Sequence, residues 1–247
     1  MGNIIDSNRQ QACGGTCICP FITEPEGIIS LHHYPPGDEG RGRLIQMIQQ
    51  SFNAAYEAEV KDYCDELIGL DVDRQLQGVA GLRPGNNAVM FSEQYLDDPA
   101  DHLIRKHTGQ DVNRHRMVEI GNLVVTGTGN TRWLFVALNA FLFAAGFQWV
   151  ICTAISPLIR LFQRIGLDPV VLCDADPARL SADGSSWGCY YDLKPKVCFG
   201  SIDAGHKKIS AAITSRHPLL QKLYAESYVA GAEYANHRKS QQSAVNQ

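Results

Sequence analysis

Two glutamates and one arginine have the side chains that acid–base chemistry needs, set in apolar surroundings. Glu119 lies within the apolar run 117–125, Glu93 lies in the segment 91–95, and Arg83 ends a second apolar run. Burial raises the pKa of a carboxyl group, so a carboxylate in a partly desolvated cleft can accept a proton from a reacting group. We expect Glu119 to be the catalytic base and Glu93 the second candidate. Arg83 would bind a substrate carboxylate or offset charge at the reacting centre.

Asn122 is the fourth candidate for catalysis. It follows Gly121, which interrupts the apolar run and indicates a bulge or a close backbone approach. Backbone N–H groups at such a bulge, together with the Asn122 amide, can stabilise a tetrahedral oxyanion. A structural alternative stays open for Glu119, in which it only forms an ion pair with Arg83 or Arg116.

A glycine-rich loop between a predicted strand and a predicted helix is a candidate phosphate site. The loop consists of Gly127, Thr128, Gly129, Asn130, Thr131 and Arg132. Its N–H groups and the dipole of the following helix can hold a phosphate. It lacks the Gly-Lys-Ser/Thr ending of a P-loop and the third glycine of a dinucleotide fingerprint, which disfavours ATP and NAD. A plain glycine turn is the alternative.

The elements that position these residues are predicted from hydrophobic periodicity and from glycine and proline punctuation. The second half alternates strands and helices: a strand at 117–125, a helix at 132–145, a strand at 148–153, a helix at 156–165, and strands at 170–173 and 196–202. Such alternation is typical of βαβ crossovers, so we predict an α/β fold with a largely parallel segment of sheet.

The first half is less regular. Residues 1–40 are rich in glycine and proline and are predicted to be an irregular arm. Apolar spacing predicts a long helix from residue 43 to about 67, then a hairpin of strands 76–83 and 88–91 and a short helix at 99–106. We divide the chain into an arm (1–40), one main domain (41–205) and a C-terminal helix with a tail (206–247).

Composition restricts the class of protein. The chain has 247 residues, of which 45% are hydrophobic and 19% are charged, with a net charge of -4. This is an ordinary globular composition, and it gives no basic face for nucleic acid. The start lacks a secretory signal, so we expect a cytoplasmic protein with reduced cysteines. Cys13, Cys17 and Cys19 lack a second pair at zinc-site spacing, and we predict no metal site.

Two further stretches bear on membranes and partners. The uncharged run 133–159 is long enough to span a bilayer, but Asn139, Gly146 and Pro157 break it. We expect a buried helix followed by a central strand, with the helix covered on both sides by the C-terminal helix or by a partner subunit. The tail 207–247 holds six Lys or Arg and two Glu. It would dock on the body, form a homodimer, or contact anionic lipid.

The order of elements after residue 116 resembles the acyl-donor core of the GNAT superfamily, which implies an α/β fold with a mixed sheet flanked by helices. In that superfamily a bulged strand and a glycine loop hold the pantetheine and diphosphate of coenzyme A, and the loop motif aligns with Val124, Gly127 and Gly129. The resemblance implies that Leu123, Val124, Val125 and the loop bind the acyl donor. Val124 replaces the usual Gln or Arg, which favours acyl carrier protein over coenzyme A as the donor.

A more specific resemblance is to the thermostable hemolysin family. It is carried in order by five segments: 91–96, 118–123, 149–153, 173–176 and 187–191. The same region is similar, more distantly, to the acyl-homoserine-lactone synthases, whose Glu-x-x-Arg aligns with Glu119 and Asn122. The loss of the Arg implies an acceptor amine other than S-adenosylmethionine.

The resemblance implies an N-acyltransferase that moves a fatty acyl group from an acyl-phosphopantetheine donor to a small amine or amino-acid-like acceptor. Trp187, Tyr190 and Tyr191 would close an acyl pocket or supply an acidic hydroxyl, unless they are packing residues. Asp174 is a candidate for binding the acceptor amine. A membrane-active lysin without enzymatic activity and a non-catalytic module that binds acyl carrier protein are the alternatives.

Overall fold

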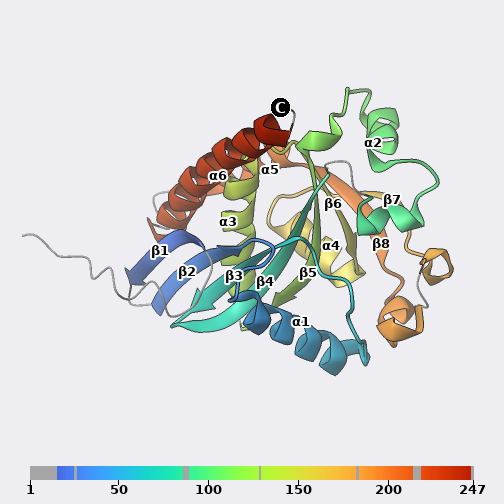
Figure 1. Cartoon of the computed structure of the whole chain (residues 1–247), viewed down its shortest axis with the longest axis horizontal. Helices are drawn as coiled ribbons and strands as arrows, with labels where there is room; N and C mark the ends of the chain where they lie inside the picture. Colours follow the sequence, from blue (N-terminus) through green and yellow to red (C-terminus); the bar gives the residue numbers. More distant parts are fainter. Residues whose placement is uncertain are drawn as a thin grey trace, which may run out of the picture.

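The computed structural model describes residues 16–24, 27–85, 89–127, 129–181, 184–213 and 218–245. Within these ranges the chain forms one eight-stranded sheet in the order β1-β2-β3-β4-β5-β6-β8-β7 (Figure 1). The strands are β1 (Thr16–Glu24), β2 (Gly27–Tyr34), β3 (Glu66–Val72), β4 (Gln75–Pro84), β5 (Met117–Val125), β6 (Trp149–Ala154), β7 (Val170–Asp174) and β8 (Lys196–Ser201). The helices are α1 (Arg41–Tyr56), α2 (Ala100–Thr108), α3 (Asn130–Ala144), α4 (Ser156–Arg164), α5 (Ile202–Ala212) and α6 (Pro218–Val245).

The fold is mixed α/β, as predicted, but the prediction of a largely parallel segment is wrong. β5 and β6 are parallel and are joined by the crossover helix α3. β8 then inserts between β6 and β7 and pairs with both in the antiparallel sense. The sequence pattern cannot distinguish a parallel from an antiparallel order here, because an antiparallel strand inserted between two others has the same local pattern as a parallel strand.

Both faces of the sheet are covered. Leu138 and Phe141 of α3 and Leu223 of α6 pack on one face over residues such as Ile68 and Leu82. On the opposite face, α1 covers the centre of the sheet and α2 covers the part formed by β6 and β8. Figure 1 shows α6, drawn in red, beside α3 and β1, although these elements are far apart in the sequence. The nearly uniformly apolar α3 is therefore buried on both sides, as predicted, and the tail helix docks on the body.

The prediction of an irregular arm over residues 1–40 is wrong for most of the residues that the structure describes there. Residues 16–24 and 27–34 form the antiparallel strands β1 and β2, and β2 pairs with β3. β1 lies at the edge of the sheet, with register irregularities on both sides of Cys19. An edge strand tolerates Pro20 because one side of it needs no hydrogen-bonding partner. Residues 1–15 lie outside the described part.

Two other predictions for the first half are wrong. The helix predicted to continue to about residue 67 ends at Tyr56, because Glu57 adopts a left-handed conformation with φ 56°. The apolar residues beyond it belong to an extended connection and to β3. The predicted strand 88–91 is not a strand over residues 89–91, since a 3-10 helix, η2 (Phe91–Tyr95), begins there. Residues 86–88 lie outside the described part.

The elements that carry the candidate site match the predictions closely. β5 spans Met117–Val125, and α2, α3, β6, α4, β7 and β8 lie within a few residues of their predicted positions. The uncharged run is divided into α3, β6 and the start of α4. Across the described ranges we find no helix of sufficient length and apolarity to cross a bilayer.

Candidate functional site

A bulge in β5 shapes the site. Opposite β4, Gly121 pairs with Gly81 and Val124 pairs with Val79, so β5 has one residue more than β4 over this stretch. Asn122 takes up the extra length with φ 47°, in the left-handed region that Asn tolerates better than most residues. Side chains of a regular strand alternate between the two faces of the sheet, and the bulge shifts this alternation by one residue. As a result, Ile120 before the bulge and Leu123 after it both pack on the face covered by α3.

The sheet opens next to this bulge. β5 and β6 pair only from Met117 opposite Trp149 to Glu119 opposite Ile151, although both strands continue further. A cavity of about 380 Å³ lies where they separate. It is lined from one face of the sheet by α3 and α4 and from the other by η2 and the segment 62–64. The cavity therefore passes through the sheet, with Glu119 at the last point of pairing between β5 and β6.

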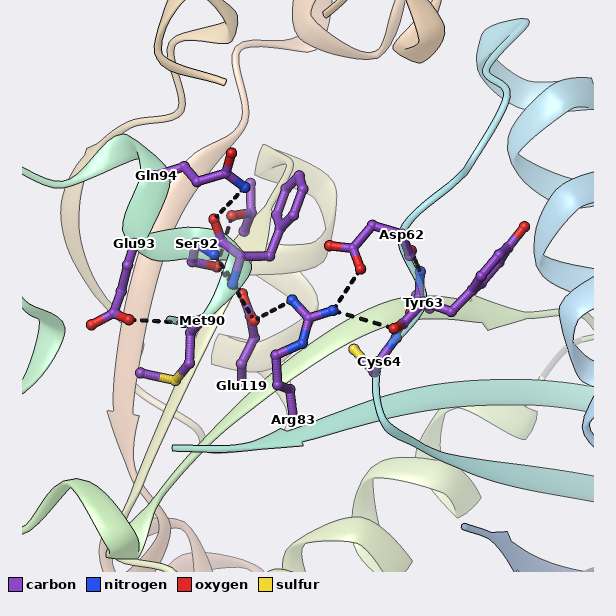
Figure 2. A network of polar contacts seen from close by, with 12 residues as sticks. Asp62, Tyr63, Cys64, Arg83, Met90, Ser92, Glu93, Gln94 and Glu119 are labelled. Carbon is purple, nitrogen blue, oxygen red and sulfur yellow. Dashed lines mark hydrogen bonds and ion pairs between the residues drawn. The ribbon is translucent and has the colours of Figure 1, made fainter. Parts of the chain in front are cut away.

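Glu119 is anchored at this point by four donors. Its side chain accepts hydrogen bonds from the backbone N–H of Phe91 at 2.7 Å, from the backbone N–H of Ser92 at 2.7 Å and from the Ser92 hydroxyl at 2.5 Å. Arg83 Nη1 is 3.5 Å away (Figure 2). The residue is only 3% exposed yet lines the cavity. Ser92 Oγ in turn lies 3.1 Å from Thr153 Oγ1 on β6, so a chain of hydroxyl groups leads to the carboxylate.

The environment of Glu119 raises its pKa. Desolvation by burial is the largest cause, and it outweighs the hydrogen bonds from Ser92 and Phe91 and the charge of Arg83, all of which favour the ionised form. The direction agrees with the prediction from sequence. A raised pKa makes the carboxylate a stronger base than an exposed glutamate.

Arg83 links Glu119 to the segment that precedes β3. It stands opposite Glu119 in the β4–β5 pairing, and its Nη2 donates to Asp62 at 2.7 Å and to the Tyr63 carbonyl at 3.2 Å. Arg83 is 9% exposed, whereas the Asp62 side chain is 45% exposed. Of the two ion-pair partners expected for Glu119 in the structural alternative, Arg83 faces it, whereas Arg116 donates to the Gly146 carbonyl.

Asn122 holds the same segment to the bulge. Its Oδ1 accepts from the backbone N–H of Cys64 at 2.8 Å, and its Nδ2 donates to the Asp62 carbonyl at 3.1 Å. Cys64 packs over the two glycines of β4 and β5, where a Cβ at Gly81 would lie 2.7 Å from its sulfur. Burial raises the pKa of the Cys64 thiol to about 12. The Asn122 amide is therefore engaged in positioning the cavity wall.

An aromatic cluster forms another part of the cavity wall. Trp187, Tyr190 and Tyr191 all line it, with the ring centroids of Trp187 and Tyr190 5.5 Å apart. The hydroxyl groups of Tyr191 and the buried Tyr95 lie 2.6 Å apart. Burial raises the pKa of Tyr190 and Tyr191, so both phenols stay protonated near neutral pH.

Two predicted site residues lie elsewhere. Glu93 points away from Glu119 (Figure 2), forms an ion pair with Arg114, and accepts from the backbone N–H of Ala100 and of Met90. Asp174 is mostly exposed and pairs with Lys196 across β7 and β8. Neither lines the cavity.

Of the eight predicted donor-binding residues that the structure describes, three line the cavity. Leu123, Val125 and Thr131 line it, while the Val124 side chain packs on the α1 side of the sheet. Gly127 and Gly129 have positive φ, and Asn130 Nδ2 caps the loop by donating to the Thr126 carbonyl. Arg132 is exposed on the first turn of α3. Thr128 lies outside the described residues.

Sequence reasoning missed three polar residues of the cavity: Asp62, Ser92 and Thr153. Asp62 lies within the predicted helix 43–67, but the helix ends at Tyr56. Ser92 is adjacent to Glu93, which is the candidate residue of that segment. Thr153 gave no signal because a threonine in a strand is ordinary. Among the described residues no group of three His, Cys, Asp or Glu side chains is placed to hold a metal. Cys13 and the side chains of Cys17 and Cys19 lie outside the described part.

Comparison with solved structures defines the class of fold. The AHL synthase LasI matches with a TM-score of 0.51 at 10% identity, over 75% of this chain and 96% of that chain. FeeM, an N-acyl amino acid synthase from uncultured soil microbes, matches with a TM-score of 0.51 at 6% identity, over 74% of this chain and 95% of that chain. The fold is therefore GNAT-like, as the resemblance implied.

The sequence comparison then gives the family. The family model described as thermostable hemolysin matches residues 34–206, and the chain belongs to this family. No curated protein sequence matches the chain.

Proposed function

We propose that the protein is an N-acyltransferase that moves a fatty acyl group from a phosphopantetheine thioester to a small amine. The observation that carries this proposal is the cavity through the sheet, which is lined by the buried carboxylate of Glu119. The hydroxyl groups of Thr153 and Ser92 form a chain that leads to this carboxylate. The GNAT-like fold supports the same class of chemistry.

The reaction needs one nucleophile and one proton acceptor. The amine nitrogen attacks the thioester carbonyl carbon, and a carbon–nitrogen bond forms as the carbon–sulfur bond breaks. The neutral amine loses one proton to the base, and the base returns one proton, directly or through solvent, to the leaving thiolate. The products are an amide and a free thiol, and the base is regenerated. Transfer of the first proton in the transition state is worth about 10²- to 10⁴-fold in rate.

Glu119 is the proton acceptor in this proposal, and the two hydroxyl groups carry the proton. The amine gives its proton to Thr153 Oγ1 as Thr153 passes its own to Ser92 Oγ, and Ser92 passes its own to Glu119. The spacings of 3.1 and 2.5 Å are hydrogen-bond distances, so each transfer requires little movement. The raised pKa of Glu119 suits this role.

The donor would lie along β5. An extended pantetheine arm contains amide groups, and the edge of β5 that turns away from β6 beyond Glu119 presents backbone groups of a matching kind. The phosphate of the arm would then reach the loop at 127–132 and the N-terminus of α3. We propose acyl carrier protein as the carrier of this arm, with coenzyme A as the alternative.

The charges of the cavity favour a cationic acceptor. Its charged lining residues are Asp62, Arg83 and Glu119, which together carry a net negative charge when all are ionised. Arg83 is already paired with Asp62 and faces Glu119, so a carboxylate on the acceptor is not needed for recognition. The half-exposed Asp62 would attract the ammonium form of the amine, which releases its extra proton to solvent to give the neutral amine that attacks the thioester.

The deciding experiment compares lipid extracts from cells that express the wild type, Glu119→Gln or Glu233→Gln, each against empty vector, by mass spectrometry. Glu233 is exposed on α6 and provides a matched change of carboxylate to amide away from the cavity. We expect a new N-acyl amine with the wild type and Glu233→Gln, and its loss with Glu119→Gln at equal protein level and melting temperature.

The alternatives predict different results. A lysin would release dye from liposomes without any acyl donor, equally well with Glu119→Gln. A non-catalytic module would bind acylated carrier protein but leave its thioester intact with a broad panel of amines. Either result, without a new amide, overturns the proposed transferase.

A further inference from the structure

A second cavity adjoins the first. It has a volume of about 320 Å³ and lies between α3, β8, α5 and the connection from α4 to β7. Four of its lining residues also line the first cavity: Ile120, Phe135, Cys152 and Phe162. The rings of Phe135 and Phe162 meet edge to face with centroids 5.1 Å apart. Two apolar side chains from different helices thus separate the cavity that holds Glu119 from a second cavity that is still more apolar.

Asn139 is a polar exception in this second cavity. It sits in the apolar helix α3 and is 8% exposed, and within the described residues no donor reaches its Oδ1. An acceptor that is buried without a partner costs free energy, so it marks a place where a bound group is expected to supply the donor.

The Asn139 amide lines the second cavity and is packed closely against α5. Gly205 of α5 stands against it, and a Cβ at Gly205 would lie 2.8 Å from Asn139 Nδ2. A side chain at position 205 would displace the amide. The charged residues Lys208 and Asp168 also line this cavity, but they pair with each other. Three other polar residues line this cavity, but His107 is exposed, Thr108 Oγ1 donates to the Ile104 carbonyl, and Ser201 Oγ accepts from the backbone N–H of Ala204. Asn139 Oδ1 is therefore the buried acceptor of this lining that is left for a ligand.

We propose that the second cavity receives the distal part of the acyl chain and that Asn139 Oδ1 accepts a hydrogen bond from a hydroxyl group on that chain. The substrate class is then a hydroxylated fatty acyl thioester. This inference rests on the proposed acyl transfer and specifies its donor. The chain passes from the thioester at Glu119 between Phe135 and Phe162, which separate to admit it.

Trp149 provides a local probe, because it lines the second cavity and not the first. The ligands are thioesters of N-acetylcysteamine, a neutral mimic of the pantetheine end, added to the purified full chain without any amine. A dodecanoyl thioester brominated at its terminal carbon should quench the fluorescence of the wild type. The quenching should be largely lost in Trp149→Phe, and also in Gly200→Leu.

Gly200 is the site for blocking the cavity. It lines the second cavity, and a Cβ there would make only an ordinary contact of 3.6 Å with Val150. Gly42→Leu is the matched control, because a Cβ at Gly42 meets nothing within 4 Å and the residue lies on α1. Quenching that survives in Gly200→Leu would overturn the placement of the chain.

Competition with monohydroxylated dodecanoyl thioesters, the hydroxyl at successive positions, tests the role of Asn139. At least one isomer should bind about threefold to tenfold more tightly than the unsubstituted thioester, as one hydrogen bond allows. This preference should vanish in Asn139→Leu while the quenching remains. Gly205→Ala should reduce the same preference, because the added methyl group displaces the Asn139 amide. This second variant tests the hydrogen bond even if Asn139→Leu fails to fold.

The outcomes separate the two proposals. If no isomer binds more tightly, or if the preference persists in Asn139→Leu, the hydroxyl assignment is wrong whatever the enzyme does. Since binding is measured without an amine, a failure to form any amide would overturn the transferase and leave the binding result standing.

Discussion

Arg83 and Glu119 are directly opposite each other in the β4–β5 pairing, yet their nearest nitrogen and oxygen atoms are 3.5 Å apart. Each is held more closely by another group. Arg83 Nη2 donates to Asp62 at 2.7 Å, and Glu119 accepts from Ser92 and Phe91 at 2.5 to 2.7 Å. The loose pair leaves Glu119 with a raised pKa, whereas a close bidentate pair with Arg83 would lower it.

The hydroxyl of Ser92 should control the pH at which the enzyme becomes active. Ser92→Ala removes one hydrogen bond that favours ionised Glu119, so the pKa of Glu119 rises further. Because the base acts in its ionised form, the acidic limb of the pH profile of kcat/KM should move to higher pH. Steady-state kinetics on the wild type and the variant checks this.

Thr153 separates the proton pathway from the pKa effect. Thr153→Val breaks the hydroxyl chain without touching Glu119, so the rate should fall while the midpoint of the acidic limb stays in place. Thr153→Ser keeps a hydroxyl and should retain most of the rate. An unmoved midpoint in Ser92→Ala, or equal rates for the two Thr153 variants, would contradict the pathway.

Glu93 should contribute to acid stability rather than to turnover. Desolvation raises the pKa of Glu93, but hydrogen bonds from Arg114 and from the backbone N–H of Ala100 and Met90 outweigh it, and the pKa ends below its ordinary value. A carboxyl group with a lowered folded pKa stabilises the fold above its unfolded pKa, and this stability is lost as the pH falls through the folded pKa. Glu93→Gln should lower the free energy of unfolding by about 1.5–3 kcal/mol at neutral pH.

Urea unfolding of Glu93→Gln at neutral pH and at successively lower pH measures this effect. The difference from the wild type should shrink as the pH falls below the ordinary carboxyl range. A loss of turnover with unchanged stability would instead return Glu93 to the candidates for the base.

The stability of the protein should depend on the hydrogen bonds of the Asn122 side chain as well as on the backbone conformation at the bulge. Asn122→Gly keeps the left-handed conformation but loses the bonds to Cys64 and Asp62, at a cost of about 1–2 kcal/mol. Asn122→Val adds backbone strain of about 1–3 kcal/mol to this loss. Denaturant unfolding should therefore rank the wild type above Asn122→Gly and Asn122→Val last. Equal stability of the two variants would show that the left-handed conformation carries no constraint.

The docking of α6 on α3 should depend on Gly231. A Cβ at this position would lie 2.2 Å from the Phe141 carbonyl oxygen, so Gly231→Ala forces the helices apart at a cost of about 1–3 kcal/mol. Gly42→Ala in α1 is the matched control: its Cβ meets nothing, and it should stabilise the helix by about 0.5–1 kcal/mol. Thermal melting of both variants checks the opposite signs. A stabilising Gly231→Ala would mean that the helices do not pack closely in solution.

Elements with strong local signals could be predicted from the amino-acid sequence alone. The interrupted run at 117–125 predicted β5 with its correct limits, and the order of motifs predicted a GNAT-like fold. Glu119, Arg83 and Asn122 are candidates from the sequence, and all three line one cavity. Periodicity, glycine breaks and motif order are local properties, and they remain visible without a tertiary structure.

The set of polar groups that share the cavity depends on long-range contacts, which local sequence patterns do not specify. The separation of β5 from β6 is a property of strand pairing, and the approach of Asp62, Ser92 and Thr153 to Glu119 joins four distant parts of the chain. Glu93 and Glu119 are alike in a sequence, but Arg114 neutralises one while burial raises the pKa of the other. Long-range contacts set desolvation and pairing, and those two effects determine which carboxylate can act as a base.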